Sequence, residues 1–308
     1  MMLRQGFLFL SESSVARAMV THAPFARWAA RRFVAGEEIG DAIAAARELN
    51  RHGMTVSLDY LGESVSSREE ATAAADTYIR IIDAMVADGI DGNVSLKLTQ
   101  MGQDIDEEFL DHNVRRVLDR AKQHDMFVRF DMESSDYVQK TLDFFQRVRG
   151  EGYDNCGIVL QSYLYRTNDD ARWASERNTR IRLCKGAYAE PESVAFPDKA
   201  DVDANFVRVM QHLLQDGTYP GIATHDEAMI EATKAFARRN HIDPSRFEFQ
   251  MLYGIRRDLQ RQLVDEGWRL RIYIGFGKAW YPYFMRRLAE RPANVFFLAS
   301  NVFRELFR

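Results

Sequence analysis

The stretch MTVSLDYL, residues 54–61, opens the segment that decides the fold. Its aliphatic and β-branched residues predict a strand. A helical pattern, ATAAADTYIRIIDAMV, follows at 71–86, and a second apolar run, NVSLKL, occupies 93–98. Ser67 and Glu70 form a capping-box pattern ahead of the helix. Strand, helix and strand in this order predict two parallel strands joined by a helix.

The same alternation continues along the chain. Further apolar runs predict strands at 126–132, 157–162, 180–186, 221–225, 247–252 and 270–275. Helical patterns cover 106–123, 136–149, 170–177, 202–215, 226–239, 255–265 and 280–290. Eight strand-then-helix units predict an α/β protein that closes as a (β/α)8 TIM-like barrel, with its site at the carboxyl ends of the strands. The alternative is an open doubly wound sheet, but no GxGxxG follows any strand.

The domain organisation follows from where the alternation begins. Helical spacing over 15–33 and 39–49 predicts an N-terminal helical segment, 1–50, ahead of a catalytic barrel with C-terminal helices, 51–308. The 308 residues carry 46% hydrophobic and 28% charged side chains, which is globular composition. Lys and Arg number 41 against 45 Asp and Glu, so no global basic character points to nucleic acid.

Two cysteines, Cys156 and Cys184, make no disulfide framework, so we expect a cytoplasmic protein. No apolar run reaches about 18 residues, so we expect no membrane span.

Polar residues gather where the predicted strands end: Asp59, Lys97, Asp131, Gln161, Arg182, Lys185, Thr224, His225, Gln250 and Tyr273. Lys97 and Arg182 lie in strands expected to be buried, where an unpaired charge is costly. An internal ion pair such as Lys97–Asp131 is one explanation, and a functional site is the other. Asp131 and Glu133 lie two residues apart in the sequence, and we do not expect them to form an acid/base pair. His225 has no neighbour at metal-ligand spacing, so we expect no metal.

The stretch WYPYFMRRLAERPAN, Trp280–Asn294, combines aromatic residues with adjacent arginines. Pro282 suits the first turn of a helix. Arg286 and Arg287 offer planar guanidinium groups that match a carboxylate, and Glu290 is placed to orient either of them. The alternative is an ordinary solvated helix. The helix would begin near the barrel mouth, which favours an anion site.

This stretch resembles the C-terminal signature of the proline dehydrogenase family. RLCKGAY (182–188), ATHDE (223–227), EFQML (248–252), RIY (271–273), SLKLT (95–99) and the aspartate of RFDMES occur in the order expected of that family. The resemblance covers roughly residues 50–295, and the length is similar to the monofunctional bacterial form. It implies a distorted barrel whose last helix crosses the mouth. It also implies FAD-dependent oxidation of L-proline to Δ1-pyrroline-5-carboxylate, the first step of proline catabolism.

The resemblance also assigns roles to residues. Lys97, Arg286 and Arg287 would hold the proline carboxylate, and Tyr273 and Tyr283 would wall the ring. Asp131 would lie beside substrate and flavin. Gln161 and Arg182 would contact the isoalloxazine, so Asp131 and Arg182 are the expected catalytic residues. Met132 would also contact the flavin. The residues expected to hold the ribityl–pyrophosphate portion are Lys185, Gly186, Ala187, Thr224 and His225.

Some inferences stay open at this point. A flavin-free lyase or aldolase using Lys97 or Lys185 as a Schiff-base amine is one alternative, and a non-catalytic carboxylate-binding module is another.

The family usually passes electrons to membrane quinone, which implies a peripheral contact at the inner face of the cell membrane. The family commonly has proline where this chain has Gly275, so we expect a looser turn before the arginine helix.

The tail NVFFLASNVFRELFR, Asn294–Arg308, has apolar residues at three- and four-residue spacing, which predicts an amphipathic helix. Membrane-surface helices usually carry many basic residues, and here only Arg304 and Arg308 supply them. We therefore expect the tail to pack on the barrel. Deleting residues 301–308 should lower the melting temperature without changing liposome flotation. A truncation that abolishes flotation while the melting temperature and dye-coupled activity are unchanged would instead assign the tail to the membrane.

Overall fold

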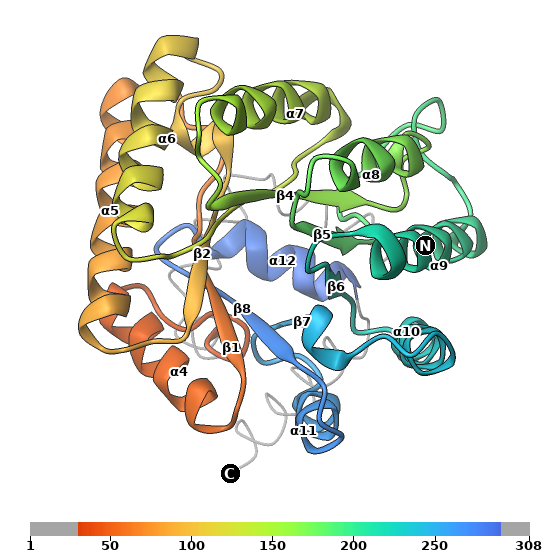
Figure 1. Ribbon diagram of the computed structural model, residues 1–308. Helices are drawn as coiled ribbons and strands as arrows, with labels where there is room; N and C mark the ends of the chain where they lie inside the picture. Colours follow the sequence, from red (N-terminus) through yellow and green to blue (C-terminus); the bar gives the residue numbers. More distant parts are fainter. Residues whose placement is uncertain (1–29, 291–308) are drawn as a thin grey trace, which may run out of the picture.

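Eight parallel strands close into a barrel in chain order, and β8 pairs back onto β1 (Figure 1). The structure, a computed structural model, describes the backbone of residues 30–290 and the side chains of 30–287. The strands are β1 (Thr55–Tyr60), β2 (Gly92–Leu96), β3 (Val128–Phe130), β4 (Cys156–Gln161), β5 (Ile181–Cys184), β6 (Gly221–Ala223), β7 (Glu248–Leu252) and β8 (Leu270–Phe276). The predicted (β/α)8 barrel is confirmed, and the open sheet is wrong.

Helices follow the strands and form an outer ring around the barrel (Figure 1). They are α4 (Ile39–Arg51), α5 (Arg68–Ala87), α6 (Glu107–Lys122), α7 (Ser135–Gly150), α8 (Thr167–Ser175), α9 (Lys199–Asp216), α10 (Glu227–Arg239), α11 (Arg257–Asp265) and α12 (Trp280–Glu290), with short 3-10 turns η1 (Leu98–Met101) and η2 (Pro244–Arg246). Figure 1 shows that α12 departs from the ring and crosses one end of the barrel. Its buried aromatic residues Trp280, Tyr281 and Phe284 hold it there.

Most predicted boundaries agree with the structure to within a few residues, and the differences have local causes. Ser67 Oγ accepts the amide hydrogen of Glu70 at 3.1 Å, so α5 begins as the capping pattern indicates. The Glu70 carboxylate accepts from the amide of Ser66 rather than Ser67, so only half of the capping box forms. Helix α8 begins three residues before the predicted start, and the Thr167 hydroxyl in its first turn donates to the carbonyl of Gln161.

Gly275 lies inside β8, opposite Asp59 of β1, and its carbonyl accepts from the amide of Ala35 at 3.1 Å. Gly275 is therefore part of the sheet ladder and not of the turn, and the looser turn before the arginine helix stays a prediction. The turn comes at Gly277, whose φ of 119° suits glycine.

The predicted helix over 15–33 lies largely outside the described residues, and the tail helix, Asn294–Arg308, lies wholly outside them. The division into segments 1–50 and 51–308 stays a prediction. Among the helices that the structure describes, none is long and apolar enough to cross a membrane.

Candidate active site

A cavity of about 750 Å³ lies at the carboxyl ends of the strands, between the barrel and α12. Strands β2 to β6 and β8 and helix α12 bring to it all but one of the residues that the sequence singles out: Lys97, Asp131, Met132, Gln161, Arg182, Lys185, Gly186, Ala187, Thr224, His225, Tyr273, Tyr283, Arg286 and Arg287. The exception is Glu290, whose side chain lies outside the described part. A cavity of this size suits a cofactor together with a small substrate.

Lys97 lies directly after β2 and is almost completely buried. Its Nζ lies 3.3 Å from both carboxylate oxygens of Asp59 and 3.9 Å from Oδ2 of Asp131. Burial alone would lower the pKa of Lys97, but the carboxylates of Asp59 and Asp131 raise it above its ordinary value. Lys97 is therefore a fixed cation. The expected Lys97–Asp131 contact exists, and Asp59 is the closer partner.

Asp131 joins the two sides of the cavity, because it accepts hydrogen bonds from both. Its Oδ1 accepts from Nη1 of Arg182 at 2.6 Å, and its Oδ2 accepts from the hydroxyl of Tyr273 at 2.7 Å. Burial, followed by the charge of Asp131, raises the pKa of Tyr273 well above its usual range. Tyr273 is thus a neutral donor, and Asp131 holds both a cation and a phenol in place.

The arginines of α12 are not solvated, so the alternative of an ordinary surface helix is wrong. Arg287 is 8% exposed, and its guanidinium carbon lies 5.1 Å from the ring centre of Tyr283. Arg286 donates from Nη1 to Oε1 of Glu63 at 2.8 Å and from Nη2 to Oε2 at 3.4 Å. Burial would raise the pKa of Glu63, but Arg286 and Lys97 lower it, so this carboxylate stays ionised.

Two cavity-side residues escaped the sequence analysis. Glu63 follows β1 in the loop at the barrel mouth, and a carboxylate just beyond a strand end was the signal that could have found it. Tyr188, the last residue of RLCKGAY, lines the cavity. Burial, followed by the charge of Glu63, raises the pKa of its phenol above the ordinary value, so the phenol is neutral.

The part of the cavity beside β4 to β6 is held by contacts behind it. A Cβ on Gly186, where φ is 112°, would lie 2.4 Å from the ring of Tyr163, so the backbone itself forms this wall. Lys185 donates to Asp226 at 2.7 Å and to Asp203. His225 accepts the amide hydrogen of Leu252 on Nε2 at 2.9 Å. These contacts fix the orientation of the lysine and the imidazole.

Glu133 faces a different set of partners from Asp131, as expected of residues that form no acid/base pair. The Thr99 hydroxyl donates to Oε2 of Glu133 at 2.8 Å and accepts the amide hydrogen of Ser64 at 3.0 Å. Ser64 follows Glu63 and has a φ of 54°. Glu133 and Thr99 therefore support the loop that carries Glu63, the partner of Arg286. No local sequence pattern indicates the contact between Glu133 and Thr99.

The stability of the protein should depend on Glu133 between about pH 4 and pH 8. Burial raises the pKa of Glu133 to about 7, against about 4.3 in an unfolded chain. The folded protein therefore holds this proton more tightly, so the contribution of Glu133 to stability is greatest below pH 4.3 and is lost as the pH rises through 7. Glu133→Gln should flatten this part of the profile, measured as the free energy of unfolding in urea at several pH values. An unchanged profile in Glu133→Gln would contradict the assignment.

Comparison with known proteins agrees with the geometry. The family model described as Proline dehydrogenase matches residues 42–300. Proline dehydrogenase 1 of Bacillus subtilis subsp. natto is 41% identical over 308 residues, which cover 99% of this chain and 100% of the relative. Proline dehydrogenase of Deinococcus radiodurans is 46% identical over 279 residues, which cover 89% of this chain and 90% of the relative.

A solved structure shows the same architecture. Proline utilization A (PutA) from Bdellovibrio bacteriovorus, inactivated by N-propargylglycine, matches with a TM-score of 0.81 and 25% identity over 93% of this chain. This chain spans 36% of the length of that protein.

Proposed function

Because the chain belongs to the proline dehydrogenase family, we propose that the cavity beneath α12 binds L-proline through its carboxylate. The observation that carries the proposal is the meeting of three buried or largely buried cations, Lys97, Arg286 and Arg287, in one cavity. Guanidinium forks suit two-point contact with a carboxylate, and the lysine adds a third positive charge. Glu290 stays a predicted partner of the arginines.

The enzyme is an FAD-dependent oxidoreductase of proline catabolism. The residues present fit the cofactor. Glycine at 186 lets the backbone pack against the ring of Tyr163 and form the cavity wall, and Lys185, Thr224 and His225 supply polar atoms from neighbouring strand ends. We propose that these residues, with Ala187, hold the ribityl and pyrophosphate portion, and that Met132, Gln161 and Arg182 contact the isoalloxazine.

When bound, FAD supplies hydride acceptance, which converts L-proline to Δ1-pyrroline-5-carboxylate. The chain orients the substrate for this step. The three cations fix one end of the proline ring, while Tyr273 and Tyr283 wall its sides, which is positional catalysis. Asp131 accepts hydrogen bonds from both Tyr273 and Arg182 and so holds the two side chains in fixed positions. Arg182 places a positive charge where negative charge would be stabilised.

The Schiff-base alternative requires a neutral lysine amine. The carboxylates of Asp59 and Asp131 raise the pKa of Lys97, so it is held as an ammonium ion. The amine of Lys185 is engaged by Asp203 and Asp226. Anaerobic titration with L-proline, followed by the visible flavin spectrum, tests the proposal. Bleaching of the flavin bands is the expected result. A protein that binds proline without bleaching would be a carboxylate-binding module, and a colourless active protein would support the lyase.

We also propose that membrane quinone accepts the electrons, and that the enzyme is cytoplasmic with a peripheral contact at the inner face of the membrane. The support is the family membership alone. Enzyme reduced by proline under anaerobic conditions should be reoxidised by a short-chain quinone. Failure of the quinone, with reoxidation by another acceptor at high rate, would overturn the proposal.

A further inference from the structure

A line of hydrogen bonds runs from the cavity, which Arg182 and Gln250 both line, through the interior of the barrel to Glu248. It begins at Arg182 on β5, which is 6% exposed. Apart from its contact with Asp131, the guanidinium donates from Nη2 to Oγ of Ser95 at 2.9 Å and from Nε to Oε1 of Gln250 at 2.5 Å. Three sides of this cation are therefore held by different strands, and Gln250 holds the Nε side.

Only one orientation of the Gln250 amide satisfies both of its hydrogen-bond partners. Its Oε1 accepts from Arg182, and its Nε2 donates to Oε1 of Glu248 at 2.6 Å. Arg182 has no acceptor to offer, and an ionised Glu248 has no donor. A flipped amide would place nitrogen against guanidinium and oxygen against carboxylate. The charge of Glu248 therefore selects the amide orientation that Arg182 requires.

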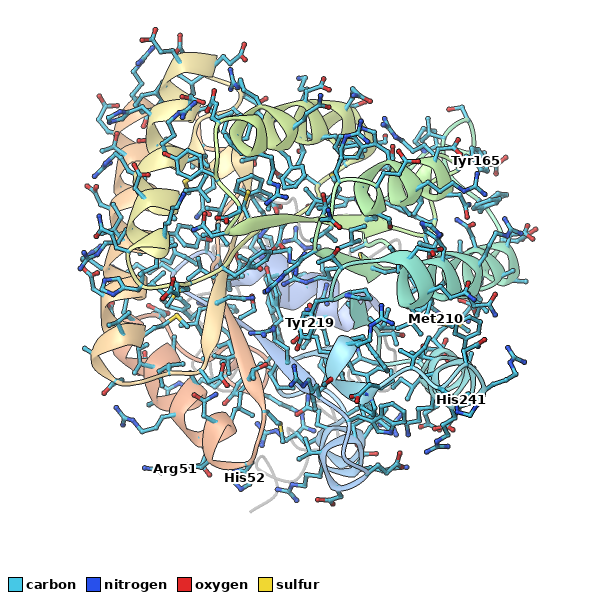
Figure 2. All side chains as sticks on the ribbon, in the orientation of Figure 1. Arg51, His52, Tyr165, Met210, Tyr219 and His241 are labelled. Carbon is cyan, nitrogen blue, oxygen red and sulfur yellow. The ribbon has the colours of Figure 1, made fainter. Side chains whose placement is uncertain are left out.

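Glu248 is itself anchored at the opposite end of the barrel from α12. Oε1 accepts from Nε of Arg271 at 2.6 Å, and Oε2 accepts from Nη2 of Arg271 and the hydroxyl of Tyr219, both at 3.1 Å. In Figure 2 the labelled Tyr219 lies over the middle of the ring of strands. Burial would raise the pKa of Glu248, but Arg271 lowers it. This carboxylate is therefore ionised and immobile.

The barrel also leaves space for the side chain of Gln250, which is the middle residue of the line. Gly221 lies on β6 beside Gln250, and a Cβ there would lie 2.3 Å from Nε2 of Gln250. A larger residue at this position would displace the amide from Glu248. Glycine at 221 is thus explained by the hydrogen-bonded line.

We propose that Glu248 is a positioning residue, which fixes the guanidinium of Arg182 through the amide of Gln250 and so tunes the bound flavin. The inference rests on the proposed placement of Arg182 beside the isoalloxazine. Glu248 does not line the cavity, so it acts only through other residues. A well-held cation stabilises the reduced flavin more than one that is free to move away.

The test is the midpoint potential of the FAD-loaded protein, measured by spectroelectrochemistry in Glu248→Gln, Gln250→Met and the double variant. If the line positions Arg182, each variant lowers the potential by at least a tenfold change in the reduction equilibrium, or about 30 mV for two electrons. The double variant should equal Gln250→Met, because the two residues act in series. If Glu248 acted only through its charge across space, Glu248→Gln would raise the midpoint potential, because removing a negative charge favours the reduced flavin.

Gln250→Met leaves the Glu248–Arg271 pair intact, so it keeps the test decisive if Glu248→Gln folds poorly. The matched control is Glu266→Gln, which removes a carboxylate paired to buried Lys234 at 2.7 Å, outside the barrel. It should leave the potential unchanged. A raised or unchanged potential in Glu248→Gln, or additive shifts in the double variant, would overturn the inference. If Arg182→Met itself leaves the potential unchanged, the proposed placement of Arg182 fails instead.

Discussion

Replacing Arg286 or Arg287 with methionine is expected to raise KM for L-proline by about tenfold to a hundredfold, with a smaller effect on kcat. A hydrogen bond to a charged group contributes about 1.5–3 kcal/mol, and each arginine is proposed to make such contacts with the carboxylate. The measurement is steady-state kinetics with a dye acceptor, together with the melting temperature of each variant. The melting temperature of Arg287→Met should change little, because its side chain lies at the cavity rather than in the apolar core. Arg286→Met should lower the melting temperature, because it leaves the largely buried Glu63 without its closest cation.

Arg286 also neutralises Glu63, so its loss leaves a largely buried carboxylate without its closest cation. The double variant Arg286→Met, Glu63→Gln separates the two effects. If the double variant regains the wild-type KM, Arg286 serves only to neutralise Glu63. An Arg287→Met variant that unfolds, or a single variant of either arginine that keeps the wild-type KM, would equally refute the substrate role.

Arg182→Met is expected to lower kcat by about a hundredfold and to lower the potential of the flavin, while KM changes less. Removing one preorganised electrostatic contact from an active site typically costs a factor of this size. The change also breaks a buried ion pair with Asp131, so stability should fall by about 3 kcal/mol. Stopped-flow reduction by proline and spectroelectrochemistry measure the first two effects, and urea unfolding measures the third.

Arg182→Lys is the matched control for charge. It keeps the cation but loses the planar fork that reaches Asp131, Ser95 and Gln250 together, so it should lie between wild type and methionine. Gln161→Leu should likewise alter turnover or potential more than KM. Wild-type kcat and potential in Arg182→Met would show that Arg182 is not beside the flavin.

The sequence by itself determined the barrel and most of the residues that line the cavity. Strand and helix periods are local properties of the chain, and eight alternating units leave few ways to cover both faces of parallel strands. Polar residues at strand ends could be assigned to one site because parallel strands in a barrel share one carboxyl end. Lys97 and Arg182 reach the same cavity for this reason.

Only the tertiary structure decided which charges meet. The structure pairs Arg286 with Glu63, which is 223 residues away in the chain. The local pairing with Glu290 that the spacing indicates stays a prediction, because the Glu290 side chain lies outside the described part. The pairing of Lys97 with Asp59 and the line from Arg182 to Glu248 join different strands across the barrel. Such contacts depend on the tilt and register of the closed sheet, which no local pattern encodes. Burial then fixes the charge state of each group, because desolvation and neighbouring charges act only once the chain has folded.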